Sequence, residues 1–280
     1  MDRKIAARVK GFRTQDGAGV SLVRVLGNST AQLFDPILML DSFDSTNPEE
    51  YTAGFPMHPH RGIETVSYVY SGKMLHKDSL GNSDMIGDGE VQWMSAGSGI
   101  LHEEQVPAAE RLLGVQLWLN LPSSDKMSLP HYHSIKNADI QEIPFEGGTL
   151  RLLAGCYQGI KGYIGKHLPL DYYDIHLEAN AILYIETPEN ESVMAFTLLG
   201  DAYIGGEYVE EKTAIKMSQG ARLLLKGGKF KSQILVMKSI PLNEPIAWAG
   251  PIVMNTQQEL GQAFQELRTG SFIKQETDYD

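Results

Sequence analysis

Short segments of alternating or continuous hydrophobic residues cover most of the chain, and glycine, asparagine and aspartate separate them. Segment 63–72 (IETVSYVYSG) is rich in β-branched and aromatic residues and ends at a glycine, which is typical of a β-strand. Segment 112–122 (LLGVQLWLNLP) is almost continuously apolar, as expected of a buried strand. After a polar stretch at 122–148, similar segments resume, such as 149–157 (TLRLLAGCY). The pattern therefore predicts an all-β chain of many short strands.

The polar stretch divides the chain into two halves with the same rhythm. A chain of 280 residues is long for one compact core and sufficient for two domains. Evenly spaced strands with glycine turns are typical of sandwiches and barrels. We therefore expect two tandem β-barrels, in residues 1–135 and 136–280.

One amphipathic helix is predicted near the end of the chain, in NTQQELGQAFQELRTG. Thr256 and Glu259 have the spacing of a capping box, and Gly270 follows the last turn as a C-terminal signal. Leucine and phenylalanine recur at the helical period and predict one buried face. We expect this helix to dock on the second barrel and close it.

Composition limits the choice of partners and compartment. The chain carries a net charge of −11 and its basic residues are scattered, which argues against direct nucleic-acid binding. No apolar run approaches the roughly 18 residues of a membrane span. The single cysteine, Cys156, excludes an intrachain disulfide framework and fits the reducing cytoplasm. The acidic surface and the lack of an evident amphipathic seam favour a monomer.

Two pairs of polar residues carry the strongest chemical signal. His58 and His60 stand at i, i+2 in MHPHRGIE, and His102 and Glu104 stand at i, i+2 in GILHEEQVP. Alternate residues of a strand face the same side about 6.6 Å apart, so each pair can direct two side chains at one point. Three imidazoles and one carboxylate suit iron, nickel, copper, manganese or zinc better than calcium. The pattern predicts a metal site with open coordination positions.

Four segments also resemble one known family: FPMHPHRGIETVSYVYSGKMLHKD, GEVQWMSAGSGILHEE, VQLWLNLP and NEPIAWAGPIVMNTQQELGQAFQELRTG. Together they are similar to the pirin family of the cupin superfamily, over nearly the whole chain. The resemblance implies a bicupin, two barrels with a metal, usually iron, in the N-terminal one. It places the metal ligands on His58, His60, His102 and Glu104.

The neighbourhood of this site includes further candidates. Arg61 directly follows the histidine pair and is expected either to anchor an acidic substrate or to pair with Glu64. General cupins often use a glutamate at the position of Glu64 as a ligand, but the pirin resemblance implies that Glu64 lies behind the ligands. Trp93 and Gln116 lie on strands expected to flank the metal, where they would contact substrate or pack in the core.

The remaining histidines give weaker signals. His76 is expected to be structural or exposed, and His131 and His133 are expected to lie in the polar connection as exposed loop residues. His167 and His176 are the only histidines of the second half and are not at i, i+2. We therefore expect the second barrel to hold no metal.

The resemblance implies two functions, and the residues leave a third open. The first is an iron-dependent dioxygenase of the quercetin 2,3-dioxygenase type, in which O2 opens the ring of a flavonol and Glu104 takes the substrate proton. The second is a regulatory protein whose metal oxidation state controls binding to a protein partner, as a transcription cofactor or a modulator of a metabolic enzyme. The third is a metal-storing or vestigial barrel without turnover.

Overall fold

The computed structural model describes residues 1–274 and divides into two compact units. Unit 1 comprises residues 1–12, 25–36 and 137–241. Unit 2 comprises residues 13–24 and 37–136, together with the chain from residue 242 onward. Within the described residues, no helix is long and apolar enough to cross a membrane.

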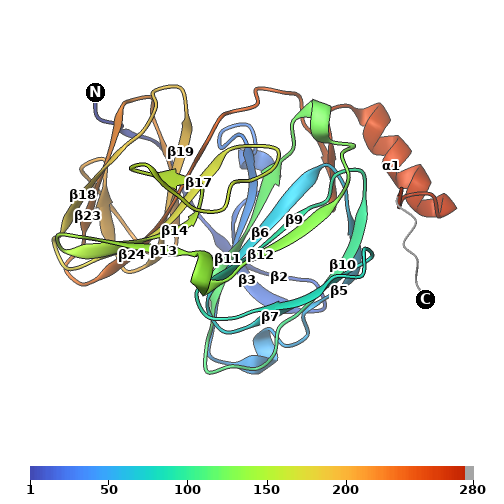
Figure 1. The fold of residues 1–280 in the computed structure, drawn as a ribbon, viewed down its shortest axis with the longest axis horizontal. Helices are drawn as coiled ribbons and strands as arrows, with labels where there is room; N and C mark the ends of the chain where they lie inside the picture. Colours follow the sequence, from blue (N-terminus) through green and yellow to red (C-terminus); the bar gives the residue numbers. More distant parts are fainter. Residues whose placement is uncertain (275–280) are drawn as a thin grey trace. The chain divides into compact units, whose positions relative to one another are not determined.

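Unit 2 contains a seven-stranded sheet and a four-stranded sheet (Figure 1). In spatial order the larger sheet consists of β12 (His131–Ile135), β9 (Glu90–Ser95), β6 (Ile63–Ser71), β11 (Leu112–Asn120), β4 (Ile37–Ser45), β3 (Val20–Leu26) and β2 (Phe12–Asp16). The smaller sheet consists of β5 (Phe55–His60), β10 (Ile100–Gln105), β7 (Met74–Asp78) and β8 (Ser83–Ile86). Strand β11 is buried along its full length and pairs antiparallel with both β6 and β4, as its continuous apolar run predicts.

Unit 1 repeats the combination of a seven-stranded and a four-stranded sheet. Its larger sheet consists of β1 (Ile5–Lys10), β22 (Thr213–Met217), β19 (Ser192–Leu199), β24 (Ser232–Ser239), β17 (Leu170–Leu177), β14 (Gly148–Ala154) and β13 (Gln141–Phe145). Its smaller sheet consists of β18 (Ile182–Glu186), β23 (Arg222–Gly227), β20 (Ala202–Ile204) and β21 (Glu207–Val209). A hairpin of β15 (Cys156–Tyr157) and β16 (Ile160–Lys161) completes the unit's strands among the described residues. The core is a continuous apolar cluster that includes Leu150, Tyr173, Ile215 and Val236.

The C-terminal segment adds a hairpin and a helix to unit 2. The hairpin pairs β25 (Ala247–Ala249) with β26 (Ile252–Met254), and helix α1 (Gln257–Thr269) packs on it through Leu260 and Ala263. The predicted capping box of Thr256 and Glu259 is present, and Gly270 adopts the left-handed conformation (φ 73°) that ends the helix. Four 3₁₀ turns complete the elements: η1 (Asn28–Thr30), η2 (Pro48–Glu50), η3 (Ser123–Asp125) and η4 (Asn137–Asp139).

Both ends of the chain differ from the expected division at residue 135. Strand β1 pairs with β22 and therefore completes the sheet of unit 1, while helix α1 lies in unit 2 instead of closing the second barrel. The physical reason is backbone pairing: β22 leaves an edge that β1 fills, and residue 253 bonds to residue 61 of unit 2.

The polar connection expected at 122–148 is also wrong in detail, because it contains two edge strands. Strand β12 pairs antiparallel with β9 in unit 2, and β13 pairs antiparallel with β14 in unit 1. His131 and His133 therefore lie on β12, not in a loop. Edge strands are half exposed and tolerate polar residues, so their pattern resembles that of a loop.

Candidate metal centre

Three histidines converge in unit 2 from two paired strands of the four-stranded sheet. His58 and His60 lie on β5, and His102 on β10 stands opposite His58 in the antiparallel register. Nε2 of His58 is 3.0 Å from Nε2 of His60 and 3.0 Å from Nε2 of His102. The three donor atoms lie within 4.8 Å of one another, and this is the group of potential metal ligands found among the described residues.

The other ring nitrogen of each histidine faces away from this point. Nδ1 of His58 is 2.8 Å from the carbonyl oxygen of Pro56, and Nδ1 of His60 is 3.0 Å from that of Pro251. A carbonyl only accepts hydrogen bonds, so both Nδ1 atoms donate and both Nε2 atoms present lone pairs to each other. Lone pairs directed at one point from 3.0 Å apart repel unless a cation lies between them. The donor set therefore fits a transition-metal ion held by imidazole nitrogen.

Burial keeps two of the three rings neutral. Together with repulsion from the neighbouring His58, burial lowers the pKa of His60 to about 3. It also places the pKa of His102 well below the usual range, with repulsion from His60 and His58 adding to the effect. Neutral imidazole is the form that binds metals, so at neutral pH these rings need lose no proton to act as ligands.

Glu104 follows His102 by two residues, but its carboxylate is not a member of this three-histidine group. It is buried and accepts hydrogen bonds from two amide side chains instead. Nε2 of Gln92 lies 2.5 Å from Oε1 of Glu104, and Nε2 of Gln116 lies 3.0 and 2.9 Å from the two carboxylate oxygens. The register of β10 against β5 shifts between His102 and Glu104. Gln116 is thus placed beside the carboxylate, while ligation by Glu104 stays a prediction.

Arg61 does not have either of the roles expected for it. Its buried guanidinium donates to the carbonyl oxygens of Ser98 (2.7 Å) and Phe272 (2.9 Å) and forms an ion pair with Glu266 of helix α1 (2.8 Å). It also stacks over the Phe272 ring at 4.2 Å. Arg61 therefore fixes the C-terminal segment next to His60, and its planar fork of donors explains why an arginine serves here.

Glu64 and Trp93 lie together in the core of the larger sheet of unit 2. Burial raises the pKa of Glu64 to about 7, although the neighbouring polar groups of Trp93 and Ser95 act in the opposite direction. Trp93 is 1% exposed. Glu64, like Glu104, is not a member of the histidine group, and its place behind the ligands stays a prediction.

Aromatic side chains flank the histidines. The indole of Trp118 on β11 packs edge-on against His60, with ring centroids 5.0 Å apart, and Trp248 of β25 lies 5.8 Å from Trp118. Neither Trp248 nor Pro251 was expected near the histidines, because both belong to a segment assigned to the other barrel. No local signal places residue 251 beside residue 60.

Asp78 was missed by sequence reasoning, and His76, expected to be structural or exposed, is buried. His76 is 1% exposed, its Nε2 is 2.8 Å from the carboxylate of Asp78, and its Nδ1 is 3.4 Å from Nδ1 of His102. A signal was available: His76 and Asp78 repeat the i, i+2 spacing of the two ligand pairs on an adjacent strand.

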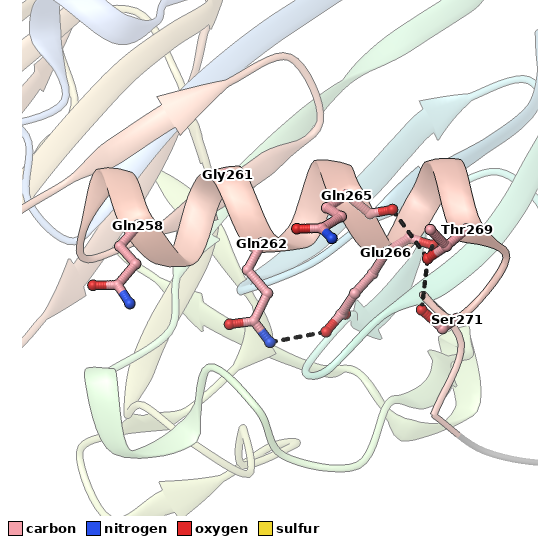
Figure 2. A pocket seen from close by; sticks show the side chains of 7 residues that line it. All are labelled: Gln258, Gly261, Gln262, Gln265, Glu266, Thr269 and Ser271. Carbon is pink, nitrogen blue, oxygen red and sulfur yellow. Dashed lines mark hydrogen bonds between the residues drawn. The ribbon is translucent and has the colours of Figure 1, made fainter.

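In unit 1 the two remaining histidines lie apart from any such group. His176 pairs with Asp174 at 2.9 Å, and the barrel interior is filled by apolar side chains. A surface hollow has also been found beside helix α1 in unit 2, lined by Gln258, Gln262 and Gln265 (Figure 2). Glu266, which pairs with Arg61, also lines it.

Known proteins confirm the resemblance to the pirin family. The pirin family model matches residues 19–119, and the model of the pirin C-terminal cupin domain matches residues 172–273. The chain belongs to the pirin family. A pirin-like protein of Caulobacter vibrioides is 37% identical, with 96% of this chain and 99% of the relative covered. Human pirin is 34% identical, with 95% of this chain and 92% of the relative covered.

The pirin fold is confirmed by a solved structure as well. The crystal structure of a quercetin 2,3-dioxygenase from Acinetobacter baumannii matches with a TM-score of 0.89 at 33% identity, covering 97% of this chain and 99% of that one. The two barrels predicted from the sequence are thus the two cupin domains of a pirin.

Proposed function

We propose that this pirin is a metal-dependent dioxygenase that opens the ring of a flavonol such as quercetin with O2. The observation that carries the proposal is the convergence of three imidazole Nε2 atoms whose other nitrogens are all engaged. The similarity to a solved structure that bears the name quercetin 2,3-dioxygenase supports the reaction class.

We propose iron as the native metal, held by His58, His60 and His102 with Glu104 as the fourth ligand. The same donors also accept nickel, copper, manganese or zinc, so metal supply contributes to the choice. When bound, the metal would supply a Lewis acid for the substrate oxygen and a redox centre for dioxygen chemistry.

The protein's own groups have two tasks in this reaction. Released from ligation, the carboxylate of Glu104 would accept the hydroxyl proton of the substrate, which makes it the general base. Gln92 and Gln116 hold that carboxylate through amide N–H donors, so its position is fixed before the substrate arrives. Trp118 packs edge-on against His60 and Trp248 lies beside Trp118, and such aromatic surroundings suit a flat aromatic substrate.

The test compares quercetin consumption by the wild type, Glu104→Ala and Glu103→Ala. Glu103 is the matched control because it is the next residue on β10, only partly buried, and lies 3.5 Å from Lys77. Loss of the base is expected to lower turnover at least about 100-fold with the fold intact, whereas Glu103→Ala keeps wild-type turnover. Retained turnover in folded Glu104→Ala would refute the role of this carboxylate.

A second candidate function is favoured by the contacts of the C-terminal segment. The ligand His60 is hydrogen-bonded to Pro251, and Arg61 is paired with Glu266 on helix α1, whose outer face lines the hollow in Figure 2. A change from Fe(II) to Fe(III) adds one charge at the histidines, so we propose that this segment transmits the metal state to a protein partner. Hydrogen exchange that is identical in helix α1 for the two oxidation states would count against regulation.

We also propose that the protein acts in the cytoplasm as a monomer without contacting nucleic acid directly. Its charge of −11 and single, partly buried cysteine support this. Elution of a 31.0 kDa species in size-exclusion chromatography is the expected result for the monomer.

A further inference from the structure

A chain of three buried polar side chains leads away from the histidine group. It begins at Asp78 and passes through His76 to His102, with contacts of 2.8 and 3.4 Å. Strands β7 and β10 are paired antiparallel, with His102 opposite Asp78 and Glu104 opposite His76, which brings these side chains together. The His76 ring is also held by the Tyr132 ring, stacked at a centroid distance of 4.2 Å.

The outer end of the chain is an ionised carboxylate. Oδ1 of Asp78 accepts the backbone N–H groups of Leu80 and Asn82 and the side-chain amide of Asn82, at 2.9 to 3.1 Å. Burial alone would raise the pKa of Asp78, but hydrogen bonds from His76 and Asn82 outweigh it and lower the pKa. The oxygen that faces His76, Oδ2, can therefore only accept a hydrogen bond.

The Asp78 carboxylate determines which ring nitrogen carries the proton in His76 and in His102. Because Oδ2 of Asp78 accepts, Nε2 of His76 carries a proton, which leaves Nδ1 of the singly protonated ring as an acceptor. That bare Nδ1 faces Nδ1 of His102, so His102 must carry its own proton on Nδ1. Its Nε2, 3.0 Å from Nε2 of His58, then has a free lone pair.

We propose that Asp78 and His76 are positioning residues that fix His102 in the tautomer with a free Nε2, the form that binds a metal. This inference rests on the proposed metal site. His58 and His60 obtain the same tautomer from backbone carbonyls, whereas His102 obtains it through two further side chains. Hydrogen-bond partners behind a ligand typically contribute about 10- to 100-fold to metal affinity.

An isosteric substitution of Asp78 should reverse which ring nitrogen of His76 and of His102 carries the proton. In Asp78→Asn the amide oxygen stays with the backbone N–H groups of Leu80 and Asn82 at the Oδ1 position, and the NH2 group turns toward His76. The Asn82 side-chain amide contacts both carboxylate oxygens of Asp78, at 3.1 and 2.9 Å, and keeps only the acceptor at the Oδ1 position in the variant. Nε2 of His76 then accepts and its Nδ1 carries the proton. His102 must accept on Nδ1 and carry its proton on Nε2, which weakens metal binding without changing the size of any side chain.

The first measurement is imidazole ¹⁵N NMR of the metal-free full-length protein. The wild type is expected to show His102 protonated on Nδ1 and His76 protonated on Nε2, and Asp78→Asn is expected to show both reversed. A wild-type His102 with its proton on Nε2 overturns the inference. This readout needs no metal, so it decides the inference even if the proposed metal function fails or the variant does not fold.

The second measurement is the affinity for Zn²⁺, in competition with a chromophoric chelator. Asp78→Asn is expected to bind about 10- to 100-fold more weakly than the wild type. The matched control is Asp174→Asn, because Asp174 makes the same i, i+2 contact with His176 at 2.9 Å but lies in unit 1. It should bind Zn²⁺ like the wild type.

The outcomes separate the two proposals. A folded Asp78→Asn with unchanged affinity and tautomers overturns the inference while leaving the metal site intact. A wild type that binds no Zn²⁺ overturns the metal site and with it the role of the chain in metal binding. Asp174→Asn weakening the affinity as much as Asp78→Asn would show a general loss of stability and would also overturn the inference.

Discussion

Glu64→Gln tests the conclusion that Glu64 is a buried neutral carboxyl and not a metal ligand. Glu64 is 1% exposed, and its burial raises its pKa from 4.5 to about 7. Glutamine has nearly the same shape as a protonated glutamate but cannot ionise. The substitution should therefore remove an electrostatic penalty while keeping the packing around Trp93 and Ser95.

The sign and size of the effect follow from proton binding. Between pH 4.5 and about 7 the folded protein holds the Glu64 proton more tightly than the unfolded chain does, so the free energy of unfolding falls as the pH rises. Above pH 7 both states are ionised and the whole penalty is present. A pKa difference of this size corresponds to about 3 kcal/mol, because each pKa unit is worth about 1.4 kcal/mol.

The assay is chemical denaturation of wild type and Glu64→Gln at pH 4.5, 6 and 8. The stability of the variant relative to wild type should rise by about 2 to 3 kcal/mol across this range, and Zn²⁺ affinity should stay unchanged. Glu103→Gln, a partly buried carboxyl on β10, serves as the control and should show no such trend. A pH-independent difference would refute the neutral carboxyl, and lost metal affinity would refute its separation from the site.

Two further predictions concern the attachment of the C-terminal segment in unit 2. Lys126 is buried and donates to the carbonyl oxygens of Gly62 and Val253. Lys126→Met should therefore lower the free energy of unfolding, measured by chemical denaturation, by about 3 kcal/mol. Unchanged stability would contradict this. Arg61→Lys keeps the charge but cannot reproduce the bonds to Ser98, Phe272 and Glu266, so amide exchange in helix α1 should accelerate about tenfold. Exchange at the wild-type rate would show that the ion pair to the helix contributes nothing.

Features that depend on local geometry could be predicted from the sequence. The two-residue period of a strand puts His58 and His60 on one face, because it follows from the geometry of the backbone. His102 joins them through the pairing of β10 with β5, for which the second i, i+2 pair was the only local sign. The capping box of Thr256 and Glu259 was predicted for the same reason, since it involves four consecutive residues. The family resemblance then gave the two-barrel fold, which the comparisons confirm.

Features that depend on distant pairing could not be predicted. Strand parity placed Glu104 on the ligand side and Gln116 was expected near the site, but the second amide that engages the carboxylate, Gln92 of β9, was not singled out. The carbonyl of Pro251 reaches His60 only because the C-terminal segment joins unit 2. Arg61 was misjudged for the same reason, because its ion-pair partner lies on a helix assigned to the other barrel.

Oxygen uptake by the Fe(II)-loaded protein, with and without quercetin, tests the central claim most directly. The control is His60→Ala, which removes one of the three converging donors. The dioxygenase account predicts uptake that requires both the metal and quercetin and is lost in the control. A protein that carries its iron but takes up no oxygen with quercetin would contradict that account and favour regulation through a protein partner.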